Sequence, residues 1–263
     1  MSYNERPDGY KGIKYGAGAM AVLGIGFALK TCTGLMGGLP PMTPLGAEHA
    51  MLSDTESGQV FATIKRTYPQ EFEGLKKEIA SRGAEFQSNQ AIAVGARTFL
   101  LQAMMRHVGE LAQAPHAALA AYRQAEITAI DMLKGQDVGA CATYFRSGSV
   151  NGLGATASGD LRQRFRDFQI KTWEGEAAGR DTPAGRKITP PDRATAMALG
   201  KAVMAEGFDG DTISRATSGA PLPDATQCGV GMAFLHAVQA LPDDQADNFT
   251  AFVASSPPTK KPA

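Results

Sequence analysis

Residues 16–29 read GAGAMAVLGIGFAL and contain no charged side chain. A helix that crosses a bilayer needs about 20 mostly apolar residues. The segment reaches that length if it continues through Lys30 to about residue 36, because a long lysine side chain can extend to the headgroups at the membrane boundary. The glycines and prolines of residues 37–41 would then end the helix. We therefore predict that residues 16–36 form a single transmembrane anchor, acting as an uncleaved signal-anchor.

The basic residues around this segment predict its orientation. Arg6, Lys11 and Lys14 precede it, and after Lys30 the next basic residue is Lys65. Positive charge is retained on the cytoplasmic side of a membrane. We expect a single-pass inner-membrane protein whose N-terminal residues 1–15 lie in the cytoplasm and whose body lies in the periplasm.

Three other interpretations of the apolar segment remain open. It resembles the apolar part of a cleaved signal peptide, although no small-residue cleavage site follows it clearly. It is also rich enough in glycine and alanine to be a helix of a soluble protein. Finally, Cys32 could carry a lipid, but Lys30 and Thr31 fit poorly before a lipid-modified cysteine.

The remaining chain carries helical signals throughout. We predict a linker over residues 37–52, a helical domain over residues 53–254 and a disordered tail over residues 255–263. No segment alternates apolar and polar residues as a half-buried strand does, so the expected fold class is all-α, a multi-helix, bundle-like soluble domain. The Gly/Ser-rich stretch 147–159 divides it into two subdomains or serves as a long crossover within one bundle.

Individual helix boundaries and core positions follow from local patterns. Ser53 and Glu56 have the spacing of a capping box, Pro69 and Pro223 are placed to begin helices, and Gly83 is expected to end one. Apolar residues at helical spacing predict the buried positions. These are Val60, Phe61, Ile64, Tyr68, Phe72, Leu75 and Ile79 in the first part, and Met197, Val203 and Met204 in a helix that follows Asp192.

Two of the three cysteines, Cys141 and Cys228, lie on predicted helices among small and apolar neighbours. An exported body would allow them to form a disulfide, which persists only in oxidising compartments. In a cytosolic protein they would instead be two buried thiols. We predict the Cys141–Cys228 disulfide together with export.

Composition and motifs exclude several classes of function. Basic and acidic residues balance at 26 each and the pI is about 6.9, so no basic surplus favours a nucleic-acid partner. His107 and Glu110 share a helix face, but in the reverse order of the repeated di-iron motif. We predict no catalytic, cofactor-binding or metal-binding residues and no cofactor.

We expect a membrane-anchored, periplasmic helical protein with a non-catalytic binding or assembly role in the cell envelope. Its partner is expected to be an envelope protein, and homo-oligomers are compatible with the same pattern. One alternative is a hydrolase of envelope polymer whose site is not visible in the sequence. Another is a soluble structural subunit of a larger protein assembly.

Overall fold

The computed structural model describes residues 43–55, 57–86, 89–148 and 157–255, and the part so described is all-α without a strand. The predicted fold class is confirmed for this part of the chain. Its helices are α1 (Pro44–Ser53), α2 (Gly58–Thr67), α3 (Pro69–Phe86), α4 (Asn89–Leu111), α5 (His116–Gln136), α6 (Val138–Ser147), α7 (Gly159–Asp181), α8 (Arg193–Ala205), α9 (Gly210–Ser218), α10 (Asp224–Gln239) and α11 (Asp243–Ser255).

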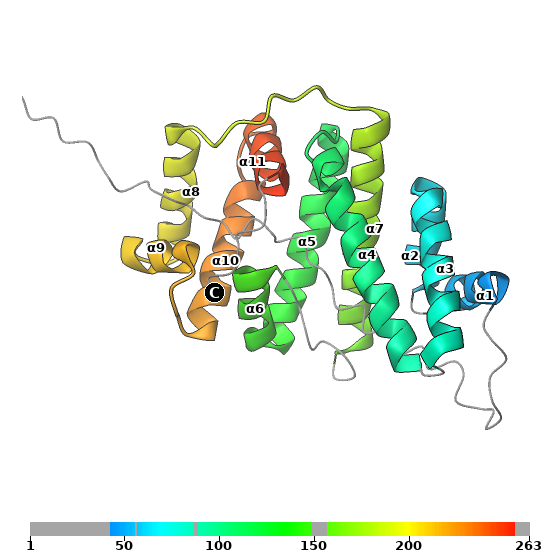
Figure 1. Ribbon diagram of the computed structural model, residues 1–263. Coiled ribbons are helices and arrows are strands. Elements are labelled where there is room, and N and C mark those ends of the chain that lie inside the picture. Colours follow the sequence, from blue (N-terminus) through cyan, green and yellow to red (C-terminus); the bar gives the residue numbers. More distant parts are fainter. Residues whose placement is uncertain (1–42, 56, 87–88, 149–156, 256–263) are drawn as a thin grey trace, which may run out of the picture.

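Helices α4, α5 and α7 occupy the middle of the molecule, with α1–α3 on one side and α6 and α8–α11 on the other (Figure 1). Helix α7 connects two apolar cores. Its first half places Phe165 and Phe168 in the core formed with α5 and α6. Its second half places Trp173 in the core formed with α1–α4. Full burial of one such side chain contributes about 1.5–3 kcal/mol, so α7 holds the two halves together.

Five of the described helices begin at a side chain that accepts a hydrogen bond from the backbone N–H three residues later. Each such cap stabilises a helix by about 1 kcal/mol, because it satisfies a donor that has no partner within the helix. The capping residues are Thr43, Asp137, Ser158, Asp192 and Asp209, at the starts of α1, α6, α7, α8 and α9.

The structure corrects three of the predicted boundaries. Residues 44–52, predicted as linker, belong to α1, because Thr43 caps that helix and Ala47 and Met51 are buried. The predicted capping box is wrong: Ser53 ends α1, and α2 begins only at Gly58. Helix α3 also continues through the expected stop at Gly83.

The predicted core is confirmed in α2 and α3 but wrong in part of α8. The residues of α8 that face the interior are Ala196, Leu199 and Val203. Met197 and Met204, predicted as core, are 41% and 47% exposed. The buried stripe of α8 thus runs through Thr195, Ala196, Leu199 and Val203 and leaves both methionines outside it.

Cys141 of α6 and Cys228 of α10 lie at disulfide-bonding distance, with their Cα atoms 5.4 Å apart. Both are fully buried. The predicted anchor over residues 16–36 lies outside the described residues, as do residues 1–15 and most of the predicted tail. Within the described ranges, no helix is both long and apolar enough to cross a membrane.

Candidate functional site

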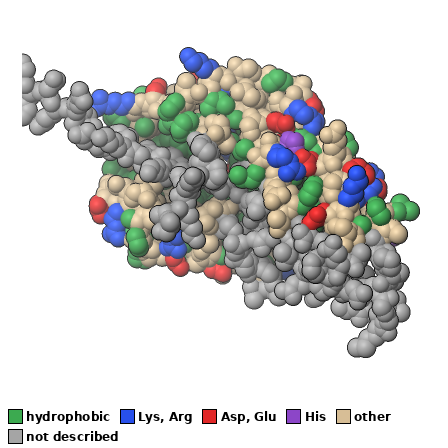
Figure 2. All heavy atoms as spheres, in the orientation of Figure 1, with side chains coloured by type: hydrophobic (Ala, Val, Ile, Leu, Met, Phe, Trp, Pro, Cys, Tyr) green, Lys and Arg blue, Asp and Glu red, His purple; other side chains and the backbone are tan. Residues whose placement is uncertain are grey.

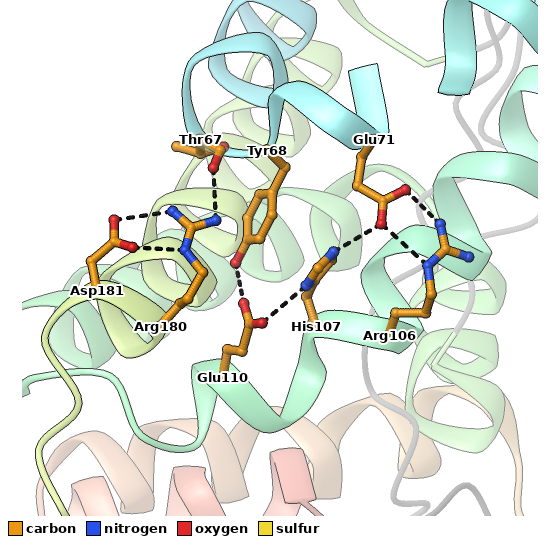
Figure 3. Close-up of polar contacts among 8 residues, drawn as sticks. All are labelled: Thr67, Tyr68, Glu71, Arg106, His107, Glu110, Arg180 and Asp181. Carbon is orange, nitrogen blue, oxygen red and sulfur yellow. Dashed lines mark hydrogen bonds and ion pairs between the residues drawn. The ribbon is translucent and has the colours of Figure 1, made fainter. Parts of the chain in front are cut away.

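Polar side chains from α3, α4 and α7 meet near one end of these helices (Figure 3). Tyr68 stands between α2 and α3, where the following Pro69 disfavours a helical backbone at Tyr68 and so separates the two helices. Glu71 lies one turn further along α3. Arg106, His107 and Glu110 lie on α4, at spacings that put them on neighbouring turns.

Hydrogen bonds link these side chains in a row. The Tyr68 hydroxyl donates to Glu110 Oε2 at 2.5 Å, and Glu110 Oε1 lies 3.2 Å from His107 Nδ1. His107 Nε2 lies 3.0 Å from Glu71 Oε1. Arg106 donates to both oxygens of Glu71, at 3.2 and 2.5 Å. Both ring nitrogens of His107 therefore face a carboxylate, and only the protonated imidazole can donate to both.

Arginine and aromatic rings enclose this row. The Arg180 guanidinium lies 4.5 Å from the centre of the Tyr68 ring, in a cation–π arrangement. It donates to both oxygens of Asp181 and to the Thr67 carbonyl oxygen. On the other side, the Tyr68 ring stacks 4.1 Å from His107. These contacts keep the Tyr68 hydroxyl directed at Glu110.

Glu176 of α7 is the least expected residue of this region. Its side chain is fully buried, and neither carboxyl oxygen has a hydrogen-bond partner among the described residues. Burial, and next the negative charge of Glu110, raise the pKa of Glu176 well above its ordinary value of 4.5. Burial thus favours the protonated carboxyl of Glu176 over the carboxylate, since an isolated buried carboxylate is very costly.

The neighbouring groups respond differently. Burial and the hydrogen bond to Glu110 raise the pKa of Tyr68, so its hydroxyl remains a donor. Burial alone would raise the pKa of Glu71, but the hydrogen bonds from Arg106 and His107 together lower it. The region thus combines one carboxyl whose pKa is raised, Glu176, with one whose pKa is lowered, Glu71, and acid–base chemistry uses such a difference.

A second buried glutamate, Glu126 of α5, differs because it has partners. The Tyr144 hydroxyl donates to it, and the positive charge of Arg123 is near. Burial nevertheless raises the pKa of Glu126 to about 7. Glu176 remains distinctive in lacking such partners.

A second polar cluster surrounds Asp247 of α11. Its buried carboxylate pairs with Arg123 at 2.8 Å, His116 at 3.1 Å and Arg186 at 3.2 Å. Arg186 belongs to the connection between α7 and α8 and also donates to the carbonyl oxygens of Ala112 and Ala114. The cluster therefore fastens this connection to the α4–α5 corner and to α11.

A surface pocket of about 490 Å³ opens beside this cluster. Its walls are the connection from Arg186 to Asp192, the first turn of α8 and the start of α11. That volume lies within the ~300–1,000 Å³ range of small-molecule sites. No local sequence pattern indicated this pocket, because its walls come from segments that are far apart in the chain.

The sequence predicted no catalytic, cofactor-binding or metal-binding residues, and it singled out His107 and Glu110 only as neighbours on one helix face. His107 and Glu110 come together, as their spacing implied, and form a hydrogen bond within a larger network. Glu176 was missed, although it follows Trp173 by three residues and so falls on the apolar side of α7. The sequence signal that could have identified Glu176 is a charged residue within an otherwise apolar helical stripe.

The described region holds no group of three or more His, Cys, Asp or Glu side chains suited to a metal ion. Acidic and basic side chains alternate on the face shown in Figure 2, where neither sign forms a large patch. No family model, curated protein or solved structure matches this chain.

Proposed function

We propose that the protein is an inner-membrane-anchored helical domain that binds a protein partner in the periplasm without catalysing a reaction. The apolar segment 16–36 and the basic residues before it support the anchor and its orientation. The cysteine pair at bonding distance supports an oxidising compartment for the body.

The outward side of α8 is the observation that carries the binding role. Along this helix the exposed apolar side chains are Met197, Met204 and four alanines, Ala194, Ala198, Ala202 and Ala205. Exposed apolar surface is characteristic of interaction sites when it is contiguous along one element. Methionine side chains are flexible and adapt to the shape of a partner.

The charges on α8 indicate what kind of partner fits. Arg193 and Lys201 are its charged residues, and both are exposed. A second copy packed antiparallel on α8 would bring the two Lys201 ammonium groups within about one turn of each other, which is unfavourable. The surface therefore suits an amphipathic helix of another protein, with an apolar stripe flanked by acidic residues.

Site-specific photo-crosslinking in intact cells tests this role. A photoreactive residue at Ala198 should give one heterologous adduct whose crosslinked peptide is amphipathic and acidic. The same residue at Gln124, exposed on α5, serves as the matched control and should give no such adduct. Lys201→Glu should abolish the adduct, whereas Lys134→Glu, at an exposed lysine of α5, should not.

Other outcomes contradict the proposal. Equal adducts at both positions would mean non-specific contact. An adduct between two copies of this chain would mean self-association through α8, and no adduct would leave α8 without a partner.

A hydrolase of envelope polymer is the second candidate. The observation in its favour is Glu176, a buried carboxyl whose pKa is raised by burial and by the charge of Glu110, since glycoside hydrolysis uses one protonated carboxyl and one carboxylate. Because Glu176 is fully buried, substrate would reach it only after neighbouring helices move apart. Purified cell-wall polymer should then release soluble fragments, and Glu176→Gln, but not Glu126→Gln, should stop the release. Unchanged release by Glu176→Gln would exclude this candidate.

A further inference from the structure

The pocket beside the Asp247 cluster has a wall that is fixed in place before any ligand arrives. Gln113 holds the backbone of Arg186 through two hydrogen bonds, of 2.9 and 3.0 Å. Asn248 of α11 holds the backbone of Thr189 in the same way, at 3.3 and 3.0 Å. Two side-chain amides thus fasten an irregular segment at two points, and a preformed wall reduces the entropy lost on binding.

Proline residues stiffen the rest of this wall. Pro190 and Pro191 follow Thr189 and line the pocket. Their rings restrict the backbone to an extended form and present apolar surface without a backbone donor. The segment runs past the end of α11 (Figure 1). The pocket therefore combines an apolar wall with a polar rim.

Most charges in the pocket are already neutralised within the protein. Asp247 is paired with the guanidinium groups of Arg123 and Arg186 and with the imidazole of His116. The Asp192 carboxylate accepts a hydrogen bond from the Thr195 N–H at 2.7 Å and caps α8. The charged groups of Asp247, Arg186 and Asp192 therefore already have partners within the protein and do not require a ligand.

Two charges of opposite sign remain available. Lys187 and Asp244 both line the pocket, both are exposed, and neither has a partner among the described residues. Their positions in the chain place them on different walls, Lys187 on the connection and Asp244 in the first turn of α11. A ligand in the pocket thus meets a free ammonium group on one side and a free carboxylate on the other.

The geometry points to a binding site for a short zwitterionic peptide. Its carboxylate would face Lys187, its amino group would face Asp244, and its backbone or side chains would lie on the prolines. The pocket volume suits a ligand of a few residues, because about 490 Å³ is within the range of small-molecule sites. This site does not depend on the partner surface of α8.

Titration of the ¹⁵N-labelled protein with triglycine tests the proposal. Saturable shifts of the Thr189 and Asn248 amide signals are expected, because both residues belong to the pocket wall. N-acetyl-triglycine amide, which has neither charge, should bind at least tenfold more weakly. Lys187→Ala and Asp244→Asn should each weaken triglycine binding about threefold to fivefold, as expected for one partly exposed charge pair.

Two variants serve as matched controls. Lys134→Ala removes another exposed lysine, and Asp160→Asn removes another first-turn aspartate, in α7. Neither should change the affinity. The proposal is overturned if millimolar triglycine causes no saturable shift, if the capped peptide binds equally well, or if the control variants weaken binding as much as the pocket variants.

Discussion

Gly179 of α7 lies directly against the backbone of Glu110 in α4, so closely that a β-carbon at Gly179 would be 1.8 Å from the Glu110 carbonyl oxygen. Ordinary carbon–oxygen contacts are nearly twice as long. Only glycine permits this crossing, and the crossing brings the Glu176 segment of α7 beside Glu110. The close approach of the two helices is therefore what assembles the polar network and closes it over Glu176.

Gly179→Ala should consequently destabilise the fold by at least about 1–3 kcal/mol, because backbone atoms of α4 must move to admit the methyl group. Urea unfolding measures the change. Gly200→Ala is the matched control, since Gly200 lies in α8 with nothing within 4 Å of an added β-carbon. That variant should gain about 0.5–1 kcal/mol from helix propensity. Equal stability of the two variants would refute the close crossing.

Replacing Glu176 by Gln should change how stability depends on pH. Because the folded pKa is raised, the folded chain retains a proton that the unfolded chain releases above its ordinary pKa of 4.5. The stability contributed by this proton is complete below that pH and is lost as pH rises towards the folded pKa, by up to about 1.4 kcal/mol per pH unit.

The stability of Glu176→Gln relative to the unaltered protein should therefore increase as the pH rises above about 4.5, the ordinary pKa of the carboxyl. Unfolding by urea at several pH values gives this difference directly. Glu206→Gln, at an exposed position after α8, should show a constant difference. A constant difference for Glu176→Gln as well would mean that the carboxyl ionises normally in the folded protein.

Asp247→Asn should cost about 3–5 kcal/mol, because it leaves the buried Arg123 guanidinium without its anionic partner. Asp244→Asn on the same helix changes an exposed side chain and should alter stability by less than about 0.5 kcal/mol. Thermal unfolding compares the two. If both variants unfold at the same temperature as the unaltered protein, Asp247 does not fasten the α7–α8 connection to α11.

The Cys141–Cys228 pair should be oxidised in protein taken from its native compartment. Mass spectrometry without reduction should detect the linked peptides. Reduction should then destabilise the domain by about 4–5 kcal/mol from chain entropy alone, since the two residues are 87 apart in the sequence. Detection of two free thiols instead would remove this support for export.

Membrane placement is tested by carbonate extraction and protease protection. The full chain should remain with carbonate-washed membranes, and protease added to spheroplasts should digest the body. Recovery in the carbonate supernatant would favour a soluble subunit. Resistance of the body in spheroplasts, with digestion after lysis, would reverse the predicted orientation.

Local sequence was sufficient to predict most helices. Pro69, Pro223 and the cap at Asp192 begin helices where expected, since caps and proline act on the residues beside them. The apolar stripe of α3 was also correct. The prediction failed at Gly83, which lies within α3, because a single glycine costs a helix only about 1 kcal/mol and does not have to end it.

The sequence by itself determined the all-α character, the approximate helix positions and the identity of the cysteine pair, because these depend on residues close in the chain or few in number. Only the tertiary structure decided which side of α8 is buried. It also decided that Tyr68, Glu71, His107 and Glu110 form one hydrogen-bonded network. Glu176 is buried beside that network. Those contacts join residues far apart in the chain. They form because α4 and α7 cross closely, and no local sequence pattern specifies that crossing.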